Sequence, residues 1–291
     1  MLGKDARILV VGGGSRIAAA LAPLLGDAAT YVVRRPAGRP RQLIVADYGD
    51  IPAATLDGVE CLINCTGAST GGAAHLDAVN VDMPRRLAVA ASAAGVRHLV
   101  HVSSFSVYGG AHVIDRNTPV APTSDYGRSK LAADTALLAL ADDRLSVTIL
   151  RLPLIYGRAS LGKLGQLMRL WAQIRVLPVP SGDVVRAMIG VDLSAQVVAR
   201  LTAEPRTGVV FAADPRPFTY ADAAQAWARA GKGTLHRLSI PRPLARFIER
   251  AAPAIGGRLF ADSRLADDDN LAIRYGLASR LYRDIALADL H

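Results

Sequence analysis

Three residues of this chain have the types and spacing needed to move a proton: Ser104, Tyr126 and Lys130. Tyr126 and Lys130 are four residues apart in DYGRSK, so on a helix they share one face. A lysine ammonium beside a phenol favours the phenolate, which brings a group with a reference pKa of about 10 into working range as an acid or base. Ser104 ends the segment HVSS and is expected to hydrogen-bond a substrate oxygen next to the tyrosine. A tyrosine and a lysine at this spacing are also common as a structural pair on helices, so the hypothesis depends on its context.

The second chemical feature is a glycine-rich turn, RILVVGGGSRIAAAL, between a strand-like run and a helix-like run. Such a turn places backbone N–H groups and a helix N-terminus where a phosphate can bind. In the spacing GxxGxxG, Gly12 takes the first position, Ser15 the second and Ala18 the third. Alanine still permits close packing of helix and strand, whereas Ser15 adds a β-carbon where a pyrophosphate approaches, so we expect Gly13 and Gly14 to supply the flexibility. A plain strand-to-helix turn explains the loop equally well.

Basic residues follow the next strand-like run, where an NAD-binding protein has a carboxylate for the ribose 2′-hydroxyl. The residues here are Arg34 and Arg35. Together with Arg16 of the glycine-rich turn, they predict a site for the 2′-phosphate of NADP(H), the preferred cofactor, with NAD(H) as the alternative. Asp47, which ends the run LIVAD, is expected to lie beside the adenine. Solvated surface arginines are the competing interpretation.

These residues require a parallel α/β scaffold, and residues 1–157 have its pattern. Short apolar runs rich in β-branched residues alternate with alanine-rich helical stretches, as in βαβ units. The expected strands are 7–11, 30–35, 42–47, 60–67, 97–104 and 147–154, and the expected helices are 16–25, 83–95 and 126–142. The candidate residues then fall at strand ends and helix starts, where open α/β sheets bind ligands. The predicted fold class is α/β, a doubly wound parallel Rossmann sheet.

A smaller region accompanies the Rossmann pattern. Residues 1–157 are expected to form the NAD(P)-binding domain, completed by roughly 184–212, whereas 158–183 and 213–291 form a substrate-binding cap. We expect one helix within 161–183 and another at 221–231, together with much proline and no long strand. The cap is therefore expected to be mostly helical.

Composition narrows the class of protein. Of 291 residues, 51% are hydrophobic and 20% are charged, as in a compact globular protein. The sequence shows neither a signal-peptide pattern nor an apolar run of membrane-spanning length, so we expect a soluble cytoplasmic protein. The net charge of +9 comes from scattered arginines and suits binding of phosphate groups. Cys61 and Cys65 would lie about 13 Å apart on one strand, too far for a disulfide, so we interpret them as reduced thiols.

Other polar residues are assigned no function. His98 and His101 straddle the start of an expected strand and are interpreted as structural, and His75 is interpreted as a solvated loop residue. The acidic run at 267–269 lacks the spacing of metal ligands and is interpreted as a solvated turn. No metal site is expected.

Several segments taken together make the chain resemble a known family. RILVVGGGSRIA, LINCTGA, NVDMPRRLAVAASAAGVRHLVHVSSFSVYG, YGRSK and LRLPLIYG occur in the order and spacing of the extended short-chain dehydrogenase/reductases, the NAD-dependent epimerase/dehydratase family. The resemblance runs through most of residues 7–201 and weakens towards the C-terminus. It implies hydride transfer between a nicotinamide and a nucleotide-linked sugar.

The resemblance also implies roles for individual residues. Ser104, Tyr126 and Lys130 match the family's catalytic serine, tyrosine and lysine, and the lysine also bonds the nicotinamide ribose. Arg186 stands where related sugar-nucleotide enzymes bind the substrate diphosphate, and Ser104 is the second substrate-binding residue. The expected cofactor-binding residues are Gly12, Gly14, Ser15, Arg16, Ile17, Arg34, Arg35, Asp47, Thr66, Gly67, Ala68, Asn80, Lys130, Pro153 and Ile155.

These features predict an NAD(P)-dependent enzyme that acts on a nucleotide-linked sugar, with Tyr126 as the acid or base. The arginines favour a keto-sugar reductase, because a reductase exchanges its NADP(H) at every turnover. The alternatives are an NAD-dependent nucleotide-sugar epimerase or dehydratase, and a non-catalytic NADP-sensing relative, against which the presence of all three catalytic residues argues. Family members pair the helix carrying Tyr126 and Lys130 with its neighbour, so we expect a homodimer, and we expect no nucleic-acid or membrane partner.

Overall fold

The computed structural model describes residues 7–157, 173, 175–180, 185–219, 221–222, 225, 234, 236–241, 243–244, 247–248 and 262–279. The chain divides into two compact units, which are described separately. The first comprises Met1–Gly109, Pro119–Pro153 and Ser194–Ala212, and the second comprises Gly110–Thr118, Leu154–Leu193 and Ala213–His291. None of the described helices is long and apolar enough to cross a membrane.

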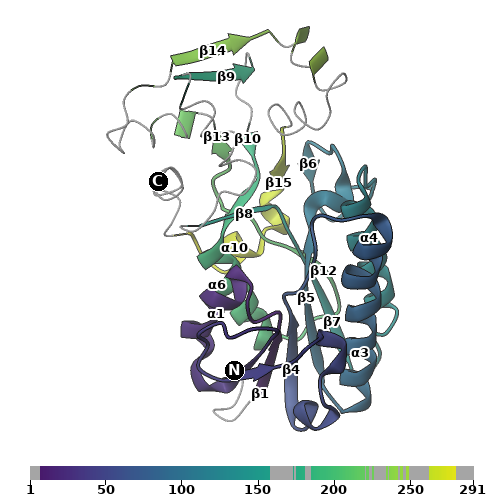
Figure 1. Cartoon of the computed structure of the whole chain (residues 1–291). Coiled ribbons are helices and arrows are strands. Elements are labelled where there is room, and N and C mark those ends of the chain that lie inside the picture. Colours follow the sequence, from purple (N-terminus) through teal and green to yellow (C-terminus); the bar gives the residue numbers. More distant parts are fainter. Residues whose placement is uncertain are drawn as a thin grey trace. The chain divides into compact units, whose positions relative to one another are not determined.

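The first unit is built on a seven-stranded sheet in which every strand is parallel to its neighbours (Figure 1). In spatial order the strands are β12 (Gly208–Phe211), β7 (Ser146–Leu152), β5 (His98–Ser104), β4 (Val59–Asn64), β1 (Arg7–Val11), β2 (Ala29–Val33) and β3 (Gln42–Ile44). The central strands are buried on both faces, which explains their continuous apolar runs. The order of connection reverses between β1 and β4, the kind of position at which Rossmann folds bind ligands. The predicted doubly wound parallel sheet is confirmed.

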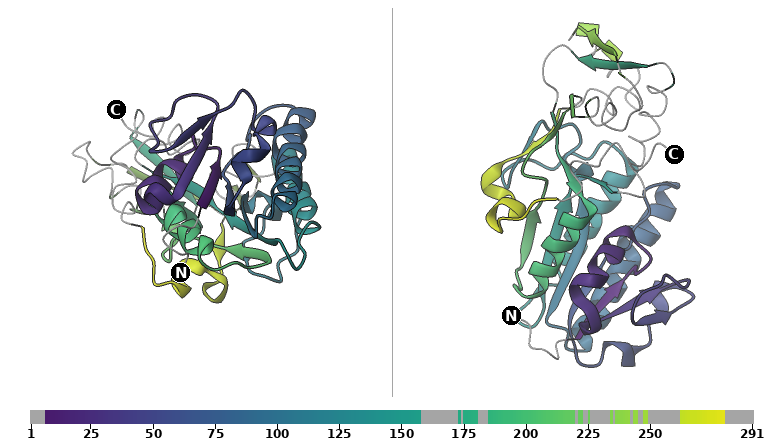
Figure 2. Two further views of the ribbon diagram at one scale, coloured as in Figure 1. Left: turned by 90° about the horizontal axis from the view of Figure 1, so that it is seen from below. Right: turned by 90° about the vertical axis from the view of Figure 1, so that its left-hand side faces the viewer.

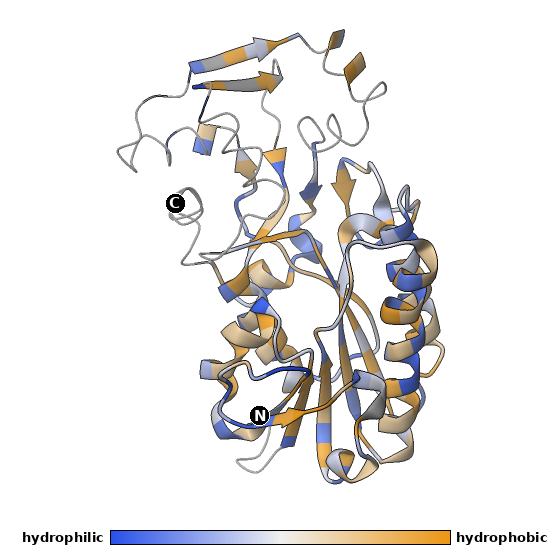
Figure 3. Ribbon diagram, in the orientation of Figure 1, coloured by the Kyte–Doolittle hydropathy of each residue, from blue (hydrophilic) through white to orange (hydrophobic). Residues whose placement is uncertain are grey.

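Helices cover both faces of this sheet (Figures 1 and 2). α1 (Arg16–Leu25) and α6 (Val191–Thr202) lie on one face, and α3 (Met83–Ala93) and α4 (Asp125–Leu138) lie on the other. A serine caps α1 and another caps α4: Ser15 Oγ accepts from Ala18 N at 3.2 Å, and Ser124 Oγ accepts from Gly127 N at 3.1 Å. Hydrophobic residues run along the sheet strands, while hydrophilic residues mark the outer turns of the helices (Figure 3). The core therefore lies between the sheet and its two helical layers.

A π-helical turn, η4 (Ala78–Asp82), connects α2 (Ala73–Asp77) with α3. Wide turns of this kind occur frequently at functional sites. Here the turn carries the buried side chain of Asn80. We expected a helix from residue 83 onward, so the preceding turn is a feature that the sequence pattern did not reveal.

The described part of the second unit consists mainly of short strand pairs. β8 (Leu154–Tyr156) pairs with β11 (Met188–Gly190), β9 (Val176–Pro180) with β14 (His236–Ile240), β10 (Val185–Arg186) with β13 (Phe218–Thr219), and β6 (Val113–Ile114) with β15 (Arg264–Leu265). The short helix α10 (Leu271–Arg274) follows the turn η6 (Asp267–Asp269). Asp269 of that turn bonds Arg116, so the acidic run is partly engaged in an ion pair. Most residues of the two helices expected in the cap lie outside the described residues.

Candidate active site

The carboxyl ends of β1, β4 and β5 lie side by side, because Val11 is paired with Asn64 and Asn64 with His101. The glycine-rich turn follows the first of these ends, and the segment beginning at Cys65 follows the second. Ser104 is the last residue of β5. The first unit therefore brings most of the residues selected from the sequence to one edge of its sheet.

Gly12 makes a close backbone approach at this edge. Its φ is +82°, a left-handed conformation that disfavours residues with a side chain. A Cβ on Gly12 would lie 2.9 Å from the carbonyl carbon of Cys65 and 2.9 Å from the backbone nitrogen of Thr66. The turn after β1 can therefore pass this close to the end of β4 only with a glycine at this position.

Gly13, Gly14 and Ser15 of the same turn have different structural environments. A Cβ on Gly13 would lie 2.8 Å from Cγ1 of Val33, so Gly13 is required for packing against β2. Its expected contribution to the flexibility of the turn stays a prediction. Gly14 is exposed, and apart from its chain neighbours no atom lies within 4 Å of its Cβ position. Ser15, at the second position of the motif, caps α1. The exposed N-terminus of α1 has the positive helix dipole and the N–H groups that fit a phosphate.

Basic side chains gather near this turn. Arg16, the first residue of α1, is exposed, whereas the Ile17 side chain is 6% exposed and belongs to the core. Arg34 and Arg35 follow β2 directly and are exposed. The Arg34 guanidinium lies over the Tyr48 ring, 5.3 Å from the ring centroid, which holds it in a defined place.

Arg39 is a further cation at the site, and it was not selected from the sequence. Its Nε donates a hydrogen bond to the carbonyl oxygen of Gly13 at 2.9 Å. In the sequence it is one of several arginines in RRPAGRPRQ, and nothing in the spacing distinguishes it from Arg35 or Arg41. Only the fold shows which of these arginines touches the glycine-rich turn.

Asp47 has a local structural role in addition to its predicted one. β3 ends at Ile44, so Asp47 lies beyond the strand end where we expected it. Its Oδ1 accepts from the backbone nitrogen of Gly49 at 2.7 Å and caps the turn η2 (Tyr48–Asp50). The contact with adenine stays a prediction.

Two buried asparagines shape the segment after β4. Oδ1 of Asn64 accepts from the backbone nitrogen of Thr66 at 3.0 Å and from its Oγ1 at 2.6 Å. Oδ1 of Asn80 accepts from the Ala68 nitrogen at 2.8 Å, and its Nδ2 donates to the Ala68 oxygen at 2.9 Å. The same Nδ2 donates to Oγ of Ser129 on α4 at 2.9 Å. Asn80 thereby ties the loop after β4 to the helix that carries the catalytic candidates.

The side chain of Ser104 lies close enough to Tyr126 to influence the pKa of its phenol. Burial raises the pKa of Tyr126 above its ordinary value of 10.0, whereas Ser104 lowers it. Oγ of Ser104 also donates to Oγ of Ser106 at 3.1 Å and accepts from its backbone nitrogen at 3.1 Å. Ser104 at the end of β5 and Tyr126 at the start of α4 are therefore neighbours at this edge of the sheet.

Lys130 is 2% exposed, and its amine is directed at β5. Nζ donates to the carbonyl oxygen of Val102 at 2.8 Å and lies 3.0 Å from Nε2 of His101. Burial lowers the pKa of Lys130 from 10.5 to about 8, although the charge of Asp134 raises it. His101 is fully buried, and its Nδ1 lies 3.0 Å from Nδ2 of Asn64. The sequence led us to interpret His101 as structural only. Its contact with Lys130 was not predicted.

A buried ion pair anchors α4 behind these residues. Nε of Arg151 on β7 lies 2.9 Å from Oδ2 of Asp134, and the two side chains are 8% and 1% exposed. Nη1 of Arg151 donates to the Tyr108 hydroxyl at 2.6 Å. Burial raises the pKa of Asp134, whereas Ser103 and Arg151 lower it. The position of α4 relative to β5 and β7 is thus fixed by charge pairing as well as by apolar packing.

The remaining selected residues are divided between the two units. Gly67 is exposed in the loop after β4, and Pro153 is buried directly after β7. Ile155 lies on β8 and Arg186 on β10, both half-buried in the second unit. Their proposed contacts with cofactor and substrate stay predictions. Among the described residues, no group of three or more His, Cys, Asp or Glu is placed to hold a metal ion.

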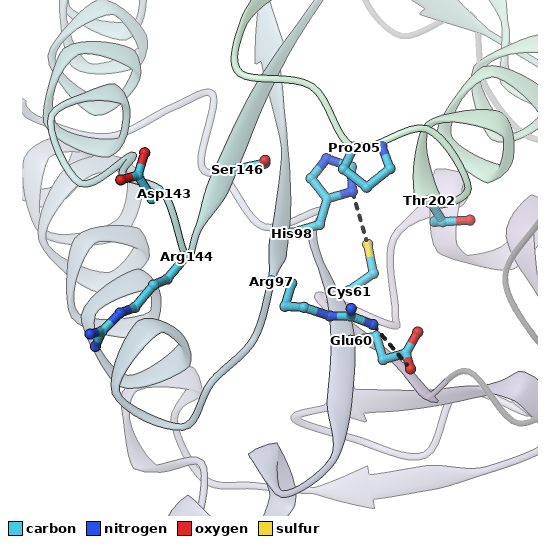
Figure 4. A pocket seen from close by; sticks show the side chains of 9 residues that line it. All are labelled: Glu60, Cys61, Arg97, His98, Asp143, Arg144, Ser146, Thr202 and Pro205. Atoms are coloured by element: carbon cyan, nitrogen blue, oxygen red, sulfur yellow. Dashed lines mark hydrogen bonds and ion pairs between the residues drawn. The ribbon is translucent and has the colours of Figure 1, made fainter.

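A cavity of about 270 Å³ lies at the opposite edge of the sheet, at the amino ends of β4, β5 and β7 (Figure 4). Its wall includes Cys61 and His98, whose Sγ and Nδ1 atoms are 3.8 Å apart. Arg97 pairs with Glu60, and the Arg144 side chain points away from the other lining residues. No residue selected from the sequence lines this cavity, so we do not assign the candidate active site to it.

The fold and the polar residues at the carboxyl edge of the sheet define a class of protein. It is a Rossmann protein with a glycine-rich turn after its first strand and with a serine, a tyrosine and a lysine on the same unit. The family model described as the NAD dependent epimerase/dehydratase family matches residues 8–211. The chain therefore belongs to the NAD-dependent epimerase/dehydratase family.

Curated relatives match over part of their length. The chain is 32% identical over 114 residues to N-acetyl-alpha-D-glucosaminyl-diphospho-ditrans,octacis-undecaprenol 4-epimerase of Escherichia coli O157:H7, covering 38% of this chain and 34% of that protein. It is 28% identical over 136 residues to UDP-glucose 4-epimerase of Vibrio cholerae, covering 44% of this chain and 41% of that protein. The matched segments thus span less than half the length of either relative.

Solved structures match over nearly the whole chain. UDP-glucuronic acid 4-epimerase from Bacillus cereus, solved in complex with NAD, has a TM-score of 0.75 and 15% identity, covering 97% of this chain and 96% of that one. The NAD-dependent NDP-hexosamine 5,6-dehydratase TunA has a TM-score of 0.74 and 20% identity, covering 98% of this chain and 96% of that one. At these identities the similarity establishes the shared fold.

Proposed function

We propose that this protein is an NAD(P)-dependent enzyme that transfers a hydride to or from a nucleotide-linked sugar, with Tyr126 exchanging the proton. The observation that carries the proposal is the proximity of Ser104 to Tyr126, at the edge of the sheet where the turn containing Gly12 follows β1. The names of the relatives, which are sugar-nucleotide or sugar-lipid epimerases and a dehydratase, support the substrate class.

The residues of the first unit fit a dinucleotide. Gly12 lets the turn after β1 pass close to the end of β4, and the exposed N-terminus of α1 suits an anion. The residue directly after β2 is Arg34, where NAD-binding proteins have a carboxylate, and Arg35 and Arg39 are its neighbours. These guanidinium groups suit a 2′-phosphate, so NADP(H) is the preferred cofactor and NAD(H) the alternative. When bound, the nicotinamide ring supplies or accepts the hydride.

Each of the proposed catalytic and substrate-binding side chains has a separate role. Tyr126 donates its phenolic proton to a keto oxygen during reduction and takes a hydroxyl proton during oxidation. Ser104, a neighbour of Tyr126, is proposed to hold the same oxygen. Lys130 in its ammonium form favours the Tyr126 phenolate. Arg186 is the proposed partner of the substrate diphosphate, since a guanidinium binds phosphates in a bidentate way.

The direction of the reaction distinguishes two forms of this proposal. The arginines after β2 favour a reductase, because a reductase exchanges NADPH for NADP⁺ at each turnover. An epimerase or dehydratase restores its cofactor within one catalytic cycle and has no need of the phosphorylated form. The names of the relatives favour this second form.

The deciding experiment identifies the cofactor and its mode of binding. The purified protein is denatured and any released dinucleotide is analysed, and the stripped protein is then titrated with NADPH and NADH by fluorescence. An NADPH affinity at least tenfold higher, a difference of about 1.4 kcal/mol, with no retained dinucleotide supports the reductase. Release of NAD, without an advantage for NADPH, supports the epimerase or dehydratase.

A matched variant then tests the catalytic assignment. Tyr126→Phe removes the hydroxyl proton and keeps the ring, so turnover of a UDP-linked keto-sugar or sugar should fall by at least 10²-fold. Dinucleotide affinity should be retained in this variant. Full turnover by Tyr126→Phe would exclude the proposed mechanism.

A further inference from the structure

A chain of hydrogen bonds at the ends of β4 and β5 fixes where the proton of His101 lies. The first link is the backbone N–H of Thr66, which can only donate, so the atom of Asn64 that faces it at 3.0 Å must be the acceptor Oδ1. The other terminal atom of the Asn64 amide is then Nδ2, which carries two protons and lies 3.0 Å from Nδ1 of His101. Nδ1 must therefore accept, and it cannot carry a proton.

The proton of the neutral imidazole is then placed on Nε2. His101 is fully buried, and burial holds its pKa well below 6.5, so the ring is neutral over the working pH range. A neutral ring has one N–H, and the amide of Asn64 leaves only Nε2 to carry it. Nε2 lies 3.0 Å from Nζ of Lys130.

This N–H requires an acceptor, and an ammonium group has none. A charged lysine has three N–H donors and no lone pair, whereas a neutral amine has one lone pair and two N–H donors. Val102 O, which lies 2.8 Å from Nζ, accepts one of the amine protons. The neutral amine of Lys130 satisfies both neighbours, and the ammonium would face a second donor at His101.

We propose that His101 is a positioning residue that favours the neutral form of the Lys130 amine in the unliganded protein, with Asn64 selecting the imidazole tautomer. The side chain of His101 acts through Lys130 and not on the substrate. The inference deepens the proposed function, on which its catalytic consequence rests, whereas the hydrogen-bond argument concerns the chain alone.

The other groups around Lys130 do not provide this effect. Asp134, one turn later on α4, favours the ammonium, but it is already paired with Arg151 of β7. The Cys65 thiol after β4 is kept neutral because burial raises its pKa to about 12. Tyr126 on the same helix face is a phenol with a raised pKa. His101, from β5, is the neighbour whose hydrogen bond needs a neutral amine.

The consequence for catalysis is a bias towards proton donation. In its neutral form Lys130 provides no positive charge to favour the phenolate, so Tyr126 keeps its proton in that form of the site. The protonated phenol is the form needed to reduce a keto group. The dependence of kcat on pH should show a step where Lys130 loses its proton. In a variant lacking His101, this step should move to higher pH.

The first test measures the charge of Lys130 directly in the unliganded protein. The chain has four lysines, Lys4, Lys130, Lys163 and Lys232, so ¹³Cε-lysine NMR can follow each one in a pH titration. His101→Phe should raise the Lys130 pKa by about one unit, the size expected when one hydrogen bond favours only one protonation state. His98→Phe is the matched control, because His98 is a buried histidine of the same strand that bonds Thr148. An unchanged or lower Lys130 pKa in His101→Phe would overturn the proposal.

The second test reads the tautomer and requires no variant of His101. In ¹⁵N-labelled wild-type protein, with the ring assigned by its nuclear Overhauser contacts to Asn64, we expect the proton on Nε2. In Asn64→Asp both terminal atoms accept hydrogen bonds, so the proton should move to Nδ1 and the Lys130 pKa should rise. A wild-type ring protonated on Nδ1 contradicts the proposal. Both measurements use unliganded protein, so their failure is distinguishable from a failure of the proposed enzymatic function.

Discussion

Arg39 is hydrogen-bonded to Gly13, with its Nε 2.9 Å from the glycine carbonyl oxygen. The bond joins the loop after β2 to the turn after β1. Arg34, at the end of β2, is held over the Tyr48 ring. The basic groups proposed to recognise a 2′-phosphate are thus positioned by contacts within the first unit before any ligand arrives.

Removal of this basic cluster should change cofactor preference. Arg34→Ala combined with Arg35→Ala is expected to weaken NADPH binding at least tenfold and leave NADH binding nearly unchanged, because only NADPH loses charge-assisted hydrogen bonds. Fluorescence titration of the stripped protein measures both affinities. Arg144→Ala, an exposed arginine at the opposite edge of the sheet, is the control. Equal losses of affinity for NADPH and NADH would show that the two arginines do not bind the 2′-phosphate.

Two glycines of the same turn should differ sharply in their tolerance of a side chain. Gly12→Ala is expected to abolish dinucleotide binding and to lower the melting temperature, because its Cβ would lie 2.9 Å from the backbone of Cys65 and Thr66 at a φ of +82°. Gly14→Ala should fold like the wild type, since its Cβ position is open. Thermal unfolding and NADPH titration of the two variants give the comparison. A stable Gly12→Ala that binds normally would refute the role assigned to this approach.

Much of the first unit was predictable because its signals are local. Buried parallel strands are continuous apolar runs, and β1 and α1 have the bounds that the sequence pattern gave, 7–11 and 16–25. Ser104 and Tyr126 are also neighbours, although 22 positions separate them, because a strand end and a helix start meet at one sheet edge. The turn η4 and the choice of Arg39 among its neighbouring arginines depend on tertiary packing, which leaves no local pattern.

The role of His101 had a signal that the sequence analysis did not use. Strand residues alternate between faces, so His101 and Ser103 share one face of β5. Lys130 and Asp134 share one face of α4 by their spacing of four. The two polar pairs meet: His101 Nε2 lies 3.0 Å from Lys130 Nζ, and Ser103 lies close enough to Asp134 to lower the pKa of its carboxyl. Matching polar spacings on a strand and on the helix that packs against it indicate such contacts, whereas a histidine considered alone does not.

The buried ion pair of Asp134 and Arg151 should be far more important for stability than the exposed pairs. Arg151→Met leaves the Asp134 carboxylate buried without its partner and is expected to lower the free energy of unfolding by about 3–5 kcal/mol. Arg97→Met breaks the pair with Glu60, whose side chains are 71% and 39% exposed, and should cost less than about 1 kcal/mol. Urea denaturation measures both. Similar small losses would show that apolar packing alone fixes α4.

The expected homodimer predicts that the outer faces of α3 and α4 are covered in solution. Val89 on α3 is an exposed valine, and α4 presents small residues such as Ala132. Val89→Arg should convert a dimer into a monomer, because an arginine cannot be buried there without a partner. Light scattering after size exclusion measures the mass, and Leu24→Arg on α1, on the other face of the sheet, is the control. A monomeric wild type would exclude the dimer.

Asp214 of the second unit should make the stability of the protein depend on pH. Its Oδ2 accepts from the Tyr156 hydroxyl at 2.5 Å, and burial raises its pKa from 3.8 to about 7. The folded chain therefore retains a proton that the unfolded chain has released, so the stabilisation is full below about pH 4 and is lost as the pH rises through about 7.

Asp214→Asn isolates this effect, because an amide keeps an acceptor for Tyr156 and does not titrate. Relative to this variant, the free energy of unfolding of the wild type should fall by about 2–3 kcal/mol between about pH 5 and pH 8, at 1.36 kcal/mol per pKa unit. Urea unfolding at several pH values provides the two curves, and other titrating groups cancel in their difference. A difference that stays constant, or that grows in favour of the wild type at high pH, would mean that Asp214 is ionised in the folded protein and that its neighbours compensate for its burial.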